Sequence, residues 1–173
     1  RPILDSLGVD KNYQKGQLRV VTGTPTLDEG DIILKATLKE MNEWQQFDFP
    51  VAATFRHFCI ETLSSYTDDN QACISEVELL DDKGQVIDKV VYVDSELADQ
   101  NLGVGENLYD GDVSSFWHTD PTAKASHPHQ IIIDMQEIYK VTAFRVKVRE
   151  GSFLSGKVKE FQLYTRPQFF LFH

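Results

Sequence analysis

The sequence predicts an all-β protein folded as an antiparallel β-sandwich. Short stretches rich in β-branched and aromatic residues recur along the chain, and two of them, 44–49 and 141–149, alternate apolar and polar side chains. Turn signals separate the stretches, as in the Asp-Asp-Lys-Gly run at 81–84. No stretch has the spacing of a long amphipathic helix. Many short strands with turns between them are typical of a sandwich or barrel.

Each element is justified by its own local pattern. Strands are expected at 18–22, 31–40, 44–49, 55–63, 74–80, 86–93, 131–134, 141–149 and 158–164. The 31–40 stretch fits neither a helical nor a strand period well, and strand is favoured because its neighbours are rich in β-formers. Residues 94–105 are acidic and expected to be irregular or briefly helical, and 64–71 and 151–156 are expected loops. Residues 1–17 read as a linker or lead-in, which leaves 18–173 as a single domain.

Composition narrows the class of protein. The 173 residues are enough for one well-cored domain, and 41% hydrophobic residues with eleven Phe indicate a globular chain. The formal net charge of -10 does not suit nucleic acid or an anionic membrane surface, because both require a basic face. No apolar run approaches the roughly 18 residues that cross a bilayer. Neutral or cationic partners remain open.

Two further features bear on context. The chain begins with Arg1 and shows no signal peptide or lipidation motif, so we expect an excised portion of a longer protein and a monomeric module. Cys59 and Cys73 have no Cys-x-x-Cys spacing. Free thiols are favoured over a disulfide, which stays open if the two strands are neighbours.

The stretch at 106–118 carries the strongest local chemistry. It reads Glu-Asn-Leu-Tyr-Asp-Gly-Asp-Val-Ser-Ser-Phe-Trp-His, in which Asp110 and Asp112 flank Gly111 and a serine pair precedes two large aromatic residues. Carboxylate, hydroxyl and carbonyl oxygens suit calcium, and the glycine lets the loop turn so that several oxygens converge. The alternative is a surface Asp-Gly turn between two strands.

Several motifs in one order resemble a known family. They are Asn-Leu-Tyr-Asp-Gly-Asp at 107–112, Ser-Phe-Trp-His at 115–118, Pro-His-Gln-Ile-Ile-Ile-Asp-Met at 128–135, the Phe-containing strand at 144–149, and Gly-Lys-Val-Lys-Glu-Phe-Gln-Leu-Tyr at 156–164. Together they resemble the coagulation factor 5/8 type C, or discoidin-like, galactose-binding-like domain over most of residues 86–166. The likeness extends to family 32 carbohydrate-binding modules and to the C-terminal domain of bacterial chitobiases. It implies a discoidin-like jelly roll.

One feature departs from the family's order. The segment that normally closes the domain, an aromatic strand followed by a polar loop and another strand, has its likeness at 55–61 and 70–77, ahead of the other motifs. Each half appears once, so a circularly permuted domain is the simplest interpretation, because chain ends on a sandwich often lie close together. The rival interpretation is a fragment that joins the tail of one module to the head of the next.

The resemblance implies a structural calcium ion. Its ligands would come from the central loop and from the Ser-Glu pair that precedes one strand. They are the carbonyl of Asn107, the carboxylate of Asp110, the carbonyl of Asp112, the hydroxyl and carbonyl of Ser115, the carbonyl of Ser75 and the carboxylate of Glu76. Such an ion would join the permuted halves, with no catalytic part.

The resemblance also implies a shallow carbohydrate site at one end of the sandwich. The positions that match the family's sugar-binding residues are His118, Arg149, Asn70 and Tyr66, with Phe153 as a candidate stacking ring. Arg and His bond sugar hydroxyls, and an aromatic face packs on the C–H face of a pyranose. For each position the alternative is a solvated charge or a rim residue. Val-Arg-Glu at 148–150 replaces the family's usual Pro-Arg-Gln, which affects ligand preference.

The resulting functional hypothesis is a non-catalytic carbohydrate-binding module of a secreted or periplasmic glycoside hydrolase such as a chitobiase-like hexosaminidase. Galactose- or N-acetylglucosamine-type glycans are the expected partners, at an extracellular, periplasmic or outer cell-surface location. The runner-up is a protein-adhesion or scaffold domain of the same fold without sugar affinity. A hydrolase would need an acid/base pair, for which Asp68 with Asp69 or Asp110 with Asp112 are the candidates. Solvation and calcium explain these acids better.

Overall fold

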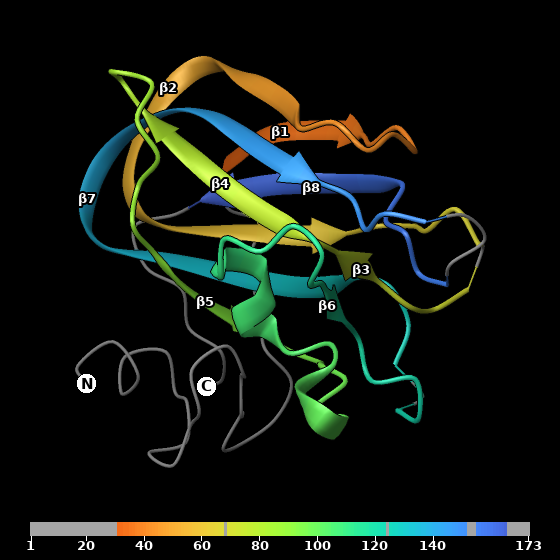
Figure 1. Ribbon diagram of the computed structural model, residues 1–173. Coiled ribbons are helices and arrows are strands. Elements are labelled where there is room, and N and C mark those ends of the chain that lie inside the picture. The colour runs from red at the N-terminus through yellow and green to blue at the C-terminus, as the bar shows by residue number, and fades with distance from the viewer. Residues whose placement is uncertain (1–30, 68, 124, 152–154, 166–173) are drawn as a thin grey trace, which may run out of the picture.

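The computed structural model describes residues 31–67, 69–123, 125–151 and 155–165 (Figure 1). Its elements in chain order are β1 (Asp31–Thr37), β2 (Gln45–Thr62), β3 (Cys73–Ile74), β4 (Glu76–Asp81), β5 (Val90–Val93), the 3-10 helices η1 (Asp99–Asn101) and η2 (Gly105–Tyr109), β6 (Trp117–His118), β7 (His129–Lys147) and β8 (Glu160–Thr165). The expected linker at 1–17 and strand at 18–22 lie outside the described residues.

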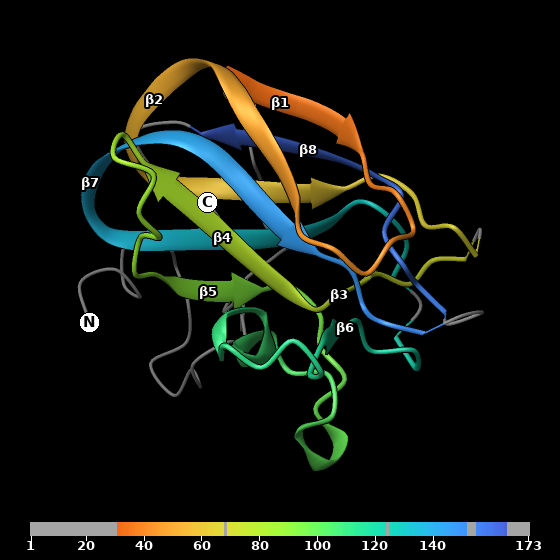
Figure 2. The same ribbon diagram turned by 45° about the horizontal axis from the view of Figure 1, so that its top comes forward.

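The strands form two layers that share their two longest members. One layer has the order β1, β8, the second half of β2, the first half of β7, and β5. The other consists of the first part of β2, the second half of β7, and β4. All these pairings are antiparallel. In Figures 1 and 2, β2 and β7 curve from one layer into the other. The predicted all-β sandwich is confirmed.

The two long strands correct the sequence prediction. The expected strands at 44–49 and 55–63 are parts of the single strand β2, which bends through Pro50. The β2–β7 register shifts between Asp48 and Ala53, so the missing N–H of proline falls where the regular ladder is already interrupted. The expected strands at 131–134 and 141–149 likewise merge into β7. Its bend contains Gln136 at a positive φ of 68°.

Smaller boundary differences have local causes. The strand expected at 86–93 is regular only over β5, from Val90, while Val86 forms an isolated bridge with Leu80 around the predicted turn. In that turn Gly84 has a φ of 75° and donates its N–H to the Asp81 carbonyl over 3.0 Å. β8 begins at Glu160, two residues later than expected. The 31–40 strand is confirmed as β1, and 94–105 contains only short 3-10 turns.

One hydrophobic core joins the two halves of the sequence. Phe58 and Ile60 come from the N-terminal half, Phe144 and Val146 from the C-terminal half, and all four belong to the same buried cluster. Trp117, fully buried, closes this core. A fragment of two unrelated half-modules would not share a core, so the arrangement is the one that a circular permutation predicts.

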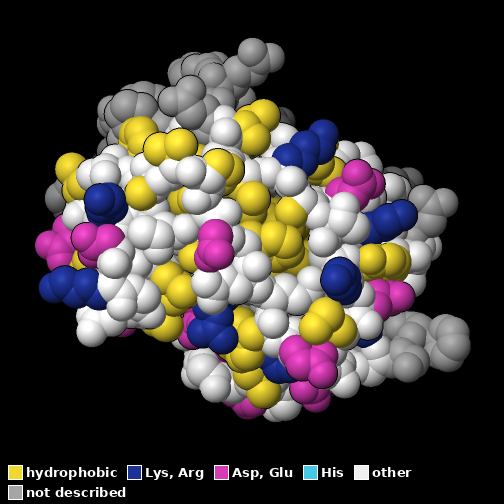
Figure 3. Space-filling model, turned by 90° about the horizontal axis from the view of Figure 1, so that it is seen from above, with side chains coloured by type: hydrophobic (Ala, Val, Ile, Leu, Met, Phe, Trp, Pro, Cys, Tyr) yellow, Lys and Arg dark blue, Asp and Glu magenta, His cyan; other side chains and the backbone are white. Residues whose placement is uncertain are grey.

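Surface and thiol chemistry complete the description. Cys59 and Cys73 are both buried and form no disulfide with each other, as favoured from the sequence. Within the described residues, no helix is long and apolar enough to cross a membrane. On the face shown in Figure 3, acidic and basic side chains are interspersed with hydrophobic ones and form no basic patch. This face therefore has no feature that attracts a polyanion.

Candidate functional site

The short strands β3 and β6 pair at one end of the sandwich and organise the candidate carbohydrate site. Cys73 lies opposite His118, and Ile74 lies opposite Trp117. Cys73 also forms a parallel bridge with Lys157, in the segment that leads into β8. Strand pairing thus brings residues from three distant parts of the sequence around Cys73. We call this end of the molecule the β3–β6 rim.

His118 is held rigidly in this rim. Its backbone N–H donates to the Gly103 carbonyl over 3.0 Å, and its carbonyl accepts from Leu97. Ring atom Nδ1 lies 2.6 Å from the Thr119 carbonyl, which can only accept, so Nδ1 carries the proton. Ring atom Nε2 is thereby left for a ligand, with no hydrogen-bond partner among the described residues. The close packing requires glycine at 103, where a Cβ would lie 2.9 Å from the His118 Cβ.

Arg149 is positioned by stacking. Its guanidinium carbon lies 3.6 Å from the centroid of the Phe116 ring, which fixes the plane of its donors. Arg149 and Lys157 both lie beside the Cys73 thiol. Burial nonetheless raises the pKa of Cys73 to about 12, so the thiol stays protonated and is no nucleophile at neutral pH. Arg149 and His118 therefore flank the same buried residue.

The loop at 64–71 supplies the aromatic and amide groups of the predicted site. The Tyr66 backbone N–H donates to the Lys157 carbonyl over 2.8 Å, which attaches the loop to the rim. The Tyr66 hydroxyl is used structurally, because it donates to the Leu38 carbonyl. The Lys159 ammonium lies 5.7 Å from the centroid of the half-exposed Tyr66 ring. Tyr66 can thus offer only part of its ring to a ligand.

Asn70 lies on the same loop with an exposed side chain, and its backbone carbonyl accepts from His129 Nε2 over 2.6 Å. Phe153, the fifth predicted sugar-binding residue, lies outside the described residues. The structure therefore joins His118 and Arg149 through Cys73, and ties the Tyr66 loop to the rim through Lys157. For Asn70, the exposure of its side chain is the observation that supports a part in ligand binding.

Asp69 organises the loop and was missed as a site residue by sequence reasoning, which considered it only as a catalytic acid. Burial would raise its pKa, but hydrogen bonds from Gln71, Thr67, Ser155 and Ser65 hold it below the usual value. A charged Asp69 therefore links the 64–71 loop to the segment before β8. The sequence signal that could have identified Asp69 was the polar loop with its paired acids, since Asp side chains favour local hydrogen bonds to neighbouring residues.

Lys157 and Thr119 were also missed. Lys157 is buried and donates to the Gly151 carbonyl. Thr119 Oγ1 donates to Gln71 Oε1 over 2.7 Å and accepts from the Ala72 N–H. Lys157 lies within one of the motifs quoted above and Thr119 directly follows another, but no local pattern shows that their surroundings meet. Their contacts depend on β3 pairing, which is a long-range property.

The loop at 106–118 is built as a ring of oxygens. Gly111 has a φ of 79°, which turns the chain so that its N–H donates to Glu76 Oε1 over 3.1 Å. Ser115 Oγ donates to Asp110 Oδ2 over 2.6 Å and to the Asp112 carbonyl over 2.9 Å. The exposed Asp112 carboxylate instead accepts from Ser114, while the backbone carbonyl of Asp112 accepts from Ser115.

Glu76 closes this ring from the other half of the sequence. Its side chain is only 4% exposed, although Asp110, a second acid, lies close enough to share a hydrogen bond with it. Burial and this neighbour raise the pKa of Glu76 to about 8. Two charged carboxylates this close, with one of them buried, repel each other and lose hydration. A cation bound between them would offset both costs.

Ser75 and Asn107 complete the predicted ligand set. Ser75 Oγ donates to the carbonyls of Val113 and Ser115 over 2.7 and 2.9 Å, so its residue is tied to the loop. Asn107 lies in η2, and its side-chain amide donates to the Phe116 carbonyl over 2.9 Å. The six predicted ligand residues thus belong to one connected loop system of oxygen donors, whose chemistry fits a hard cation.

The described residues give less support for a catalytic acid pair or for another kind of metal site. Asp68 lies outside the described residues, and the remaining acids named for hydrolysis are engaged in loop hydrogen bonds. Among the described residues there is no group of three or more His, Cys, Asp or Glu side chains that suits a metal ion. The loop at 106–118 instead depends on carbonyl and hydroxyl oxygens beside its carboxylates.

Comparisons with known proteins agree with the fold. The family model described as the F5/8 type C domain matches residues 91–168, a stretch that begins in β5 and includes β6, β7 and β8. A comparison with curated proteins finds no match. The molecule is thus an all-β sandwich of the discoidin-like type. F5/8 type C domains are typically non-catalytic binding modules, often for carbohydrate or lipid.

The matched stretch leaves out strands that the sandwich requires. β2 pairs with both β7 and β8, and β4 pairs with β7, yet both strands precede residue 91. The N-terminal half therefore supplies β2 and β4, strands that the matched stretch lacks.

Proposed function

We propose that this protein is a non-catalytic carbohydrate-binding module that binds glycans at the β3–β6 rim. The observation that carries the proposal is that His118 and Arg149 both lie beside Cys73, the first through strand pairing and the second next to its thiol. Arg149 offers a flat array of donors held over Phe116, and His118 offers an acceptor nitrogen. Donors next to an acceptor match neighbouring hydroxyls of a sugar ring.

Charge favours a neutral ligand over the other ligand class of this domain family. With a net charge of -10 and no basic patch on the face seen in Figure 3, attraction to anionic lipid headgroups is weak. Galactose- and N-acetylglucosamine-type glycans are the first candidates. We expect weak binding, with Kd of about 10 µM to 1 mM, because a shallow rim buries little surface and each hydroxyl must be desolvated.

Replacing Arg149 or His118 with Ala is expected to weaken glycan binding by about 1 to 3 kcal/mol while the fold is retained, because each substitution removes hydrogen bonds to the ligand. Calorimetric titration of the wild type and both variants measures the effect. Arg145→Ala is the matched control, since Arg145 pairs with Glu78 over 2.9 Å and lies 4.6 Å from the centroid of the Trp44 ring. An equal loss in the control would contradict the proposed site.

The proposal includes a structural calcium ion in the loop at 106–118. Support comes from the chemistry of the donor set, above all the buried Glu76 beside Asp110. When bound, calcium would supply positive charge that offsets the two carboxylates. The chain's own residues hold the loop shape, through the turn at Gly111 and the hydroxyls of Ser75 and Ser115.

Calcium is expected to raise the melting temperature of the domain, because a site that joins Glu76 to Asp110 exists only in the folded state. At free calcium about 100 times Kd, mass action adds about 2.7 kcal/mol, which corresponds to roughly 5 to 10 °C. Thermal melts of metal-free protein with and without calcium measure the shift. Glu76→Gln should abolish it and Glu78→Gln should retain it. An unchanged midpoint in the wild type would remove the ion from this proposal.

The wider context follows from the resemblance to chitobiase-associated and family 32 modules. We propose that the domain belongs to a secreted glycoside-processing enzyme and works at an extracellular, periplasmic or outer cell-surface location. There it would hold the enzyme close to its glycan. Failure to bind any member of a broad glycan panel would favour a protein-adhesion or scaffold role for the same fold.

A further inference from the structure

Asp69 lies where the Tyr66 loop, described at 64–67 and 69–71, meets the segment 155–158 that leads into β8. The two segments run side by side, since the Tyr66 N–H donates to the Lys157 carbonyl over 2.8 Å. This backbone contact fixes the start of the loop. The side chain of Asp69 is what ties the rest of the loop to the segment.

Both oxygens of the Asp69 carboxylate accept hydrogen bonds. Oδ1 accepts the Gln71 N–H over 3.0 Å and the Ser65 hydroxyl over 3.2 Å. Oδ2 accepts from the Thr67 and Ser155 hydroxyls, each over 2.9 Å. Three of these donors belong to the loop, and the fourth, Ser155, belongs to the neighbouring segment. One carboxylate therefore shapes the loop and joins it to the segment.

A second connection to the same segment runs through Thr67. Its hydroxyl donates to Asp69 and accepts the Gly156 N–H over 3.0 Å. Gly156 has a φ of 81°, and a Cβ there would lie 3.0 Å from the Gln71 Cβ. Glycine at 156 therefore permits both the turn and the close approach of the two segments.

The end of the loop reaches the β3–β6 rim through Gln71. Asp69 holds the Gln71 backbone N–H, and Gln71 Oε1 accepts from Thr119 Oγ1 over 2.7 Å. Thr119 directly follows His118, and its N–H donates to the Ala72 carbonyl over 2.9 Å. Asp69 is thus connected on one side to the segment before β8 and on the other to the strand that carries His118.

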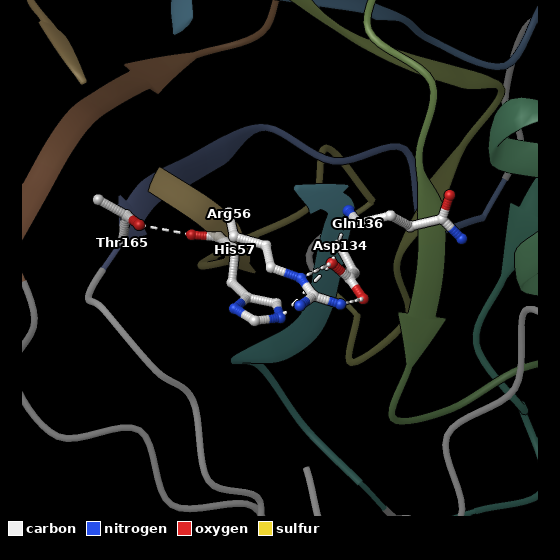
Figure 4. A network of polar contacts seen from close by, with 5 residues as sticks. All are labelled: Arg56, His57, Asp134, Gln136 and Thr165. Atoms are coloured by element: carbon white, nitrogen blue, oxygen red, sulfur yellow. Dashed lines mark hydrogen bonds and ion pairs between the residues drawn. The ribbon is translucent and has the colours of Figure 1, made fainter. Parts of the chain in front are cut away.

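The partners of Asp69 are unlike those of Asp134, another carboxylate with several donors. Figure 4 shows Asp134 beside the cationic Arg56, whose Nε donates over 2.9 Å, and Gln136, whose N–H donates over 2.8 Å. The donors to Asp69 are a backbone N–H and three hydroxyls, all neutral. Burial would raise the pKa of Asp69, but these donors hold it below the usual value. The carboxylate is therefore charged at neutral pH, which strengthens each hydrogen bond that it accepts.

We propose that Asp69 is a positioning residue of the glycan site, which holds Tyr66 and Asn70 in place beside the β3–β6 rim. This role rests on the proposed function and extends it to a residue that acts through the loop. The apparent Kd equals the intrinsic Kd divided by the fraction of molecules whose loop is correctly placed. If loss of the carboxylate lowers that fraction to about one tenth, Kd rises about tenfold.

Asp69→Ala and Ser155→Ala test this role in the full chain. The first removes the acceptor of four hydrogen bonds, and the second removes only the bond from the exposed Ser155. For a sugar that the wild type binds, from a panel of galactose- and N-acetylglucosamine-type ligands, calorimetry should show Kd raised about tenfold and about threefold respectively. Asp81→Ala is the matched control, because Asp81 Oδ1 accepts the Lys83 and Gln85 N–H groups at the other end of β4. It should leave Kd unchanged.

Amide hydrogen exchange gives a second readout, which needs no ligand. The N–H groups of Tyr66 and Gly156 keep their own acceptors in Asp69→Ala, so faster exchange there reports release of the loop. We expect an increase of about tenfold at both amides, while the amides of β7 stay protected. A saturating sugar should slow this exchange again, because coupling between loop and ligand is reciprocal. A residue that only stabilised the fold would not show this reversal.

The outcomes separate this role from the proposed function. A wild-type Kd in Asp69→Ala, or unchanged exchange at Tyr66 and Gly156, would overturn the role of Asp69 and leave glycan binding at the rim in place. An equal rise of Kd in Asp81→Ala would also overturn it. If Asp69→Ala unfolds throughout, Ser155→Ala decides by the same two measurements. A wild type that binds no sugar of the panel would overturn both the proposed function and this role.

Discussion

Residues 86–173 expressed alone are expected to be unfolded, although they contain the whole stretch that matches the F5/8 type C model. The fragment lacks β2, which pairs with β7 along most of its length and with β8. It also lacks β4, the other neighbour of β7 in the second layer. Without them the core loses Phe58, Ile60, Val77 and Leu79. Such a loss far exceeds the usual stability of a domain of about 5 to 15 kcal/mol.

The measurement is a two-dimensional NMR spectrum of the fragment beside that of the whole chain. The fragment should give collapsed, unprotected amide signals, and addition of residues 1–85 should restore dispersion if the halves still associate. A dispersed spectrum from residues 86–173 alone would contradict the joint core. It would favour a chain that joins parts of two modules.

Trp117→Ala is expected to destabilise the domain by about 3 to 5 kcal/mol, the usual cost of truncating a large buried aromatic residue. The Trp117 side chain is fully buried in the core, and its Nε1–H donates to the Ser95 carbonyl over 2.8 Å. The substitution leaves a cavity and an unsatisfied carbonyl. Because Trp117 precedes His118 on β6, the β3–β6 rim should also lose its order.

Chemical denaturation of the variant and wild type measures this loss. Trp117→Phe keeps most of the volume and should cost less than the alanine variant. Val113→Ala, on an exposed position of the same loop, is the control and should change the free energy of unfolding by no more than about 0.5 kcal/mol. A small effect of Trp117→Ala would mean that the aromatic pair does not anchor the loop to the core.

The sequence allowed most strands to be predicted, because alternation is a local signal. The stretches 44–49 and 141–149, which became the first part of β2 and the second half of β7, showed it clearly. The bends did not follow from any local pattern. Pro50 and the region around Gln136 resemble strand ends, and only the pairing of β2 with β7 on both sides of the bends makes each a single strand. Continuity through a bend is a tertiary property.

The candidate site likewise contains residues that local sequence could identify and residues that depend on tertiary pairing. The loop at 106–118 could be predicted because its acids, glycine and serines are neighbours in sequence. Glu76 entered only through the family resemblance, and its contact with Gly111 depends on how the halves assemble. Lys157 and Thr119 were missed, since their roles arise from the pairing of β3 with β6 and from the bridge to Cys73.

Chemical-shift mapping of a glycan titration tests glycan binding at the β3–β6 rim most directly. A panel of galactose- and N-acetylglucosamine-type sugars is added to isotopically labelled protein and amide shifts are followed. The account predicts saturable shifts centred on His118, Arg149, Tyr66 and Asn70, lost in Arg149→Ala and retained in Arg145→Ala. Shifts that map elsewhere, or no shifts with any sugar of the panel, would contradict it.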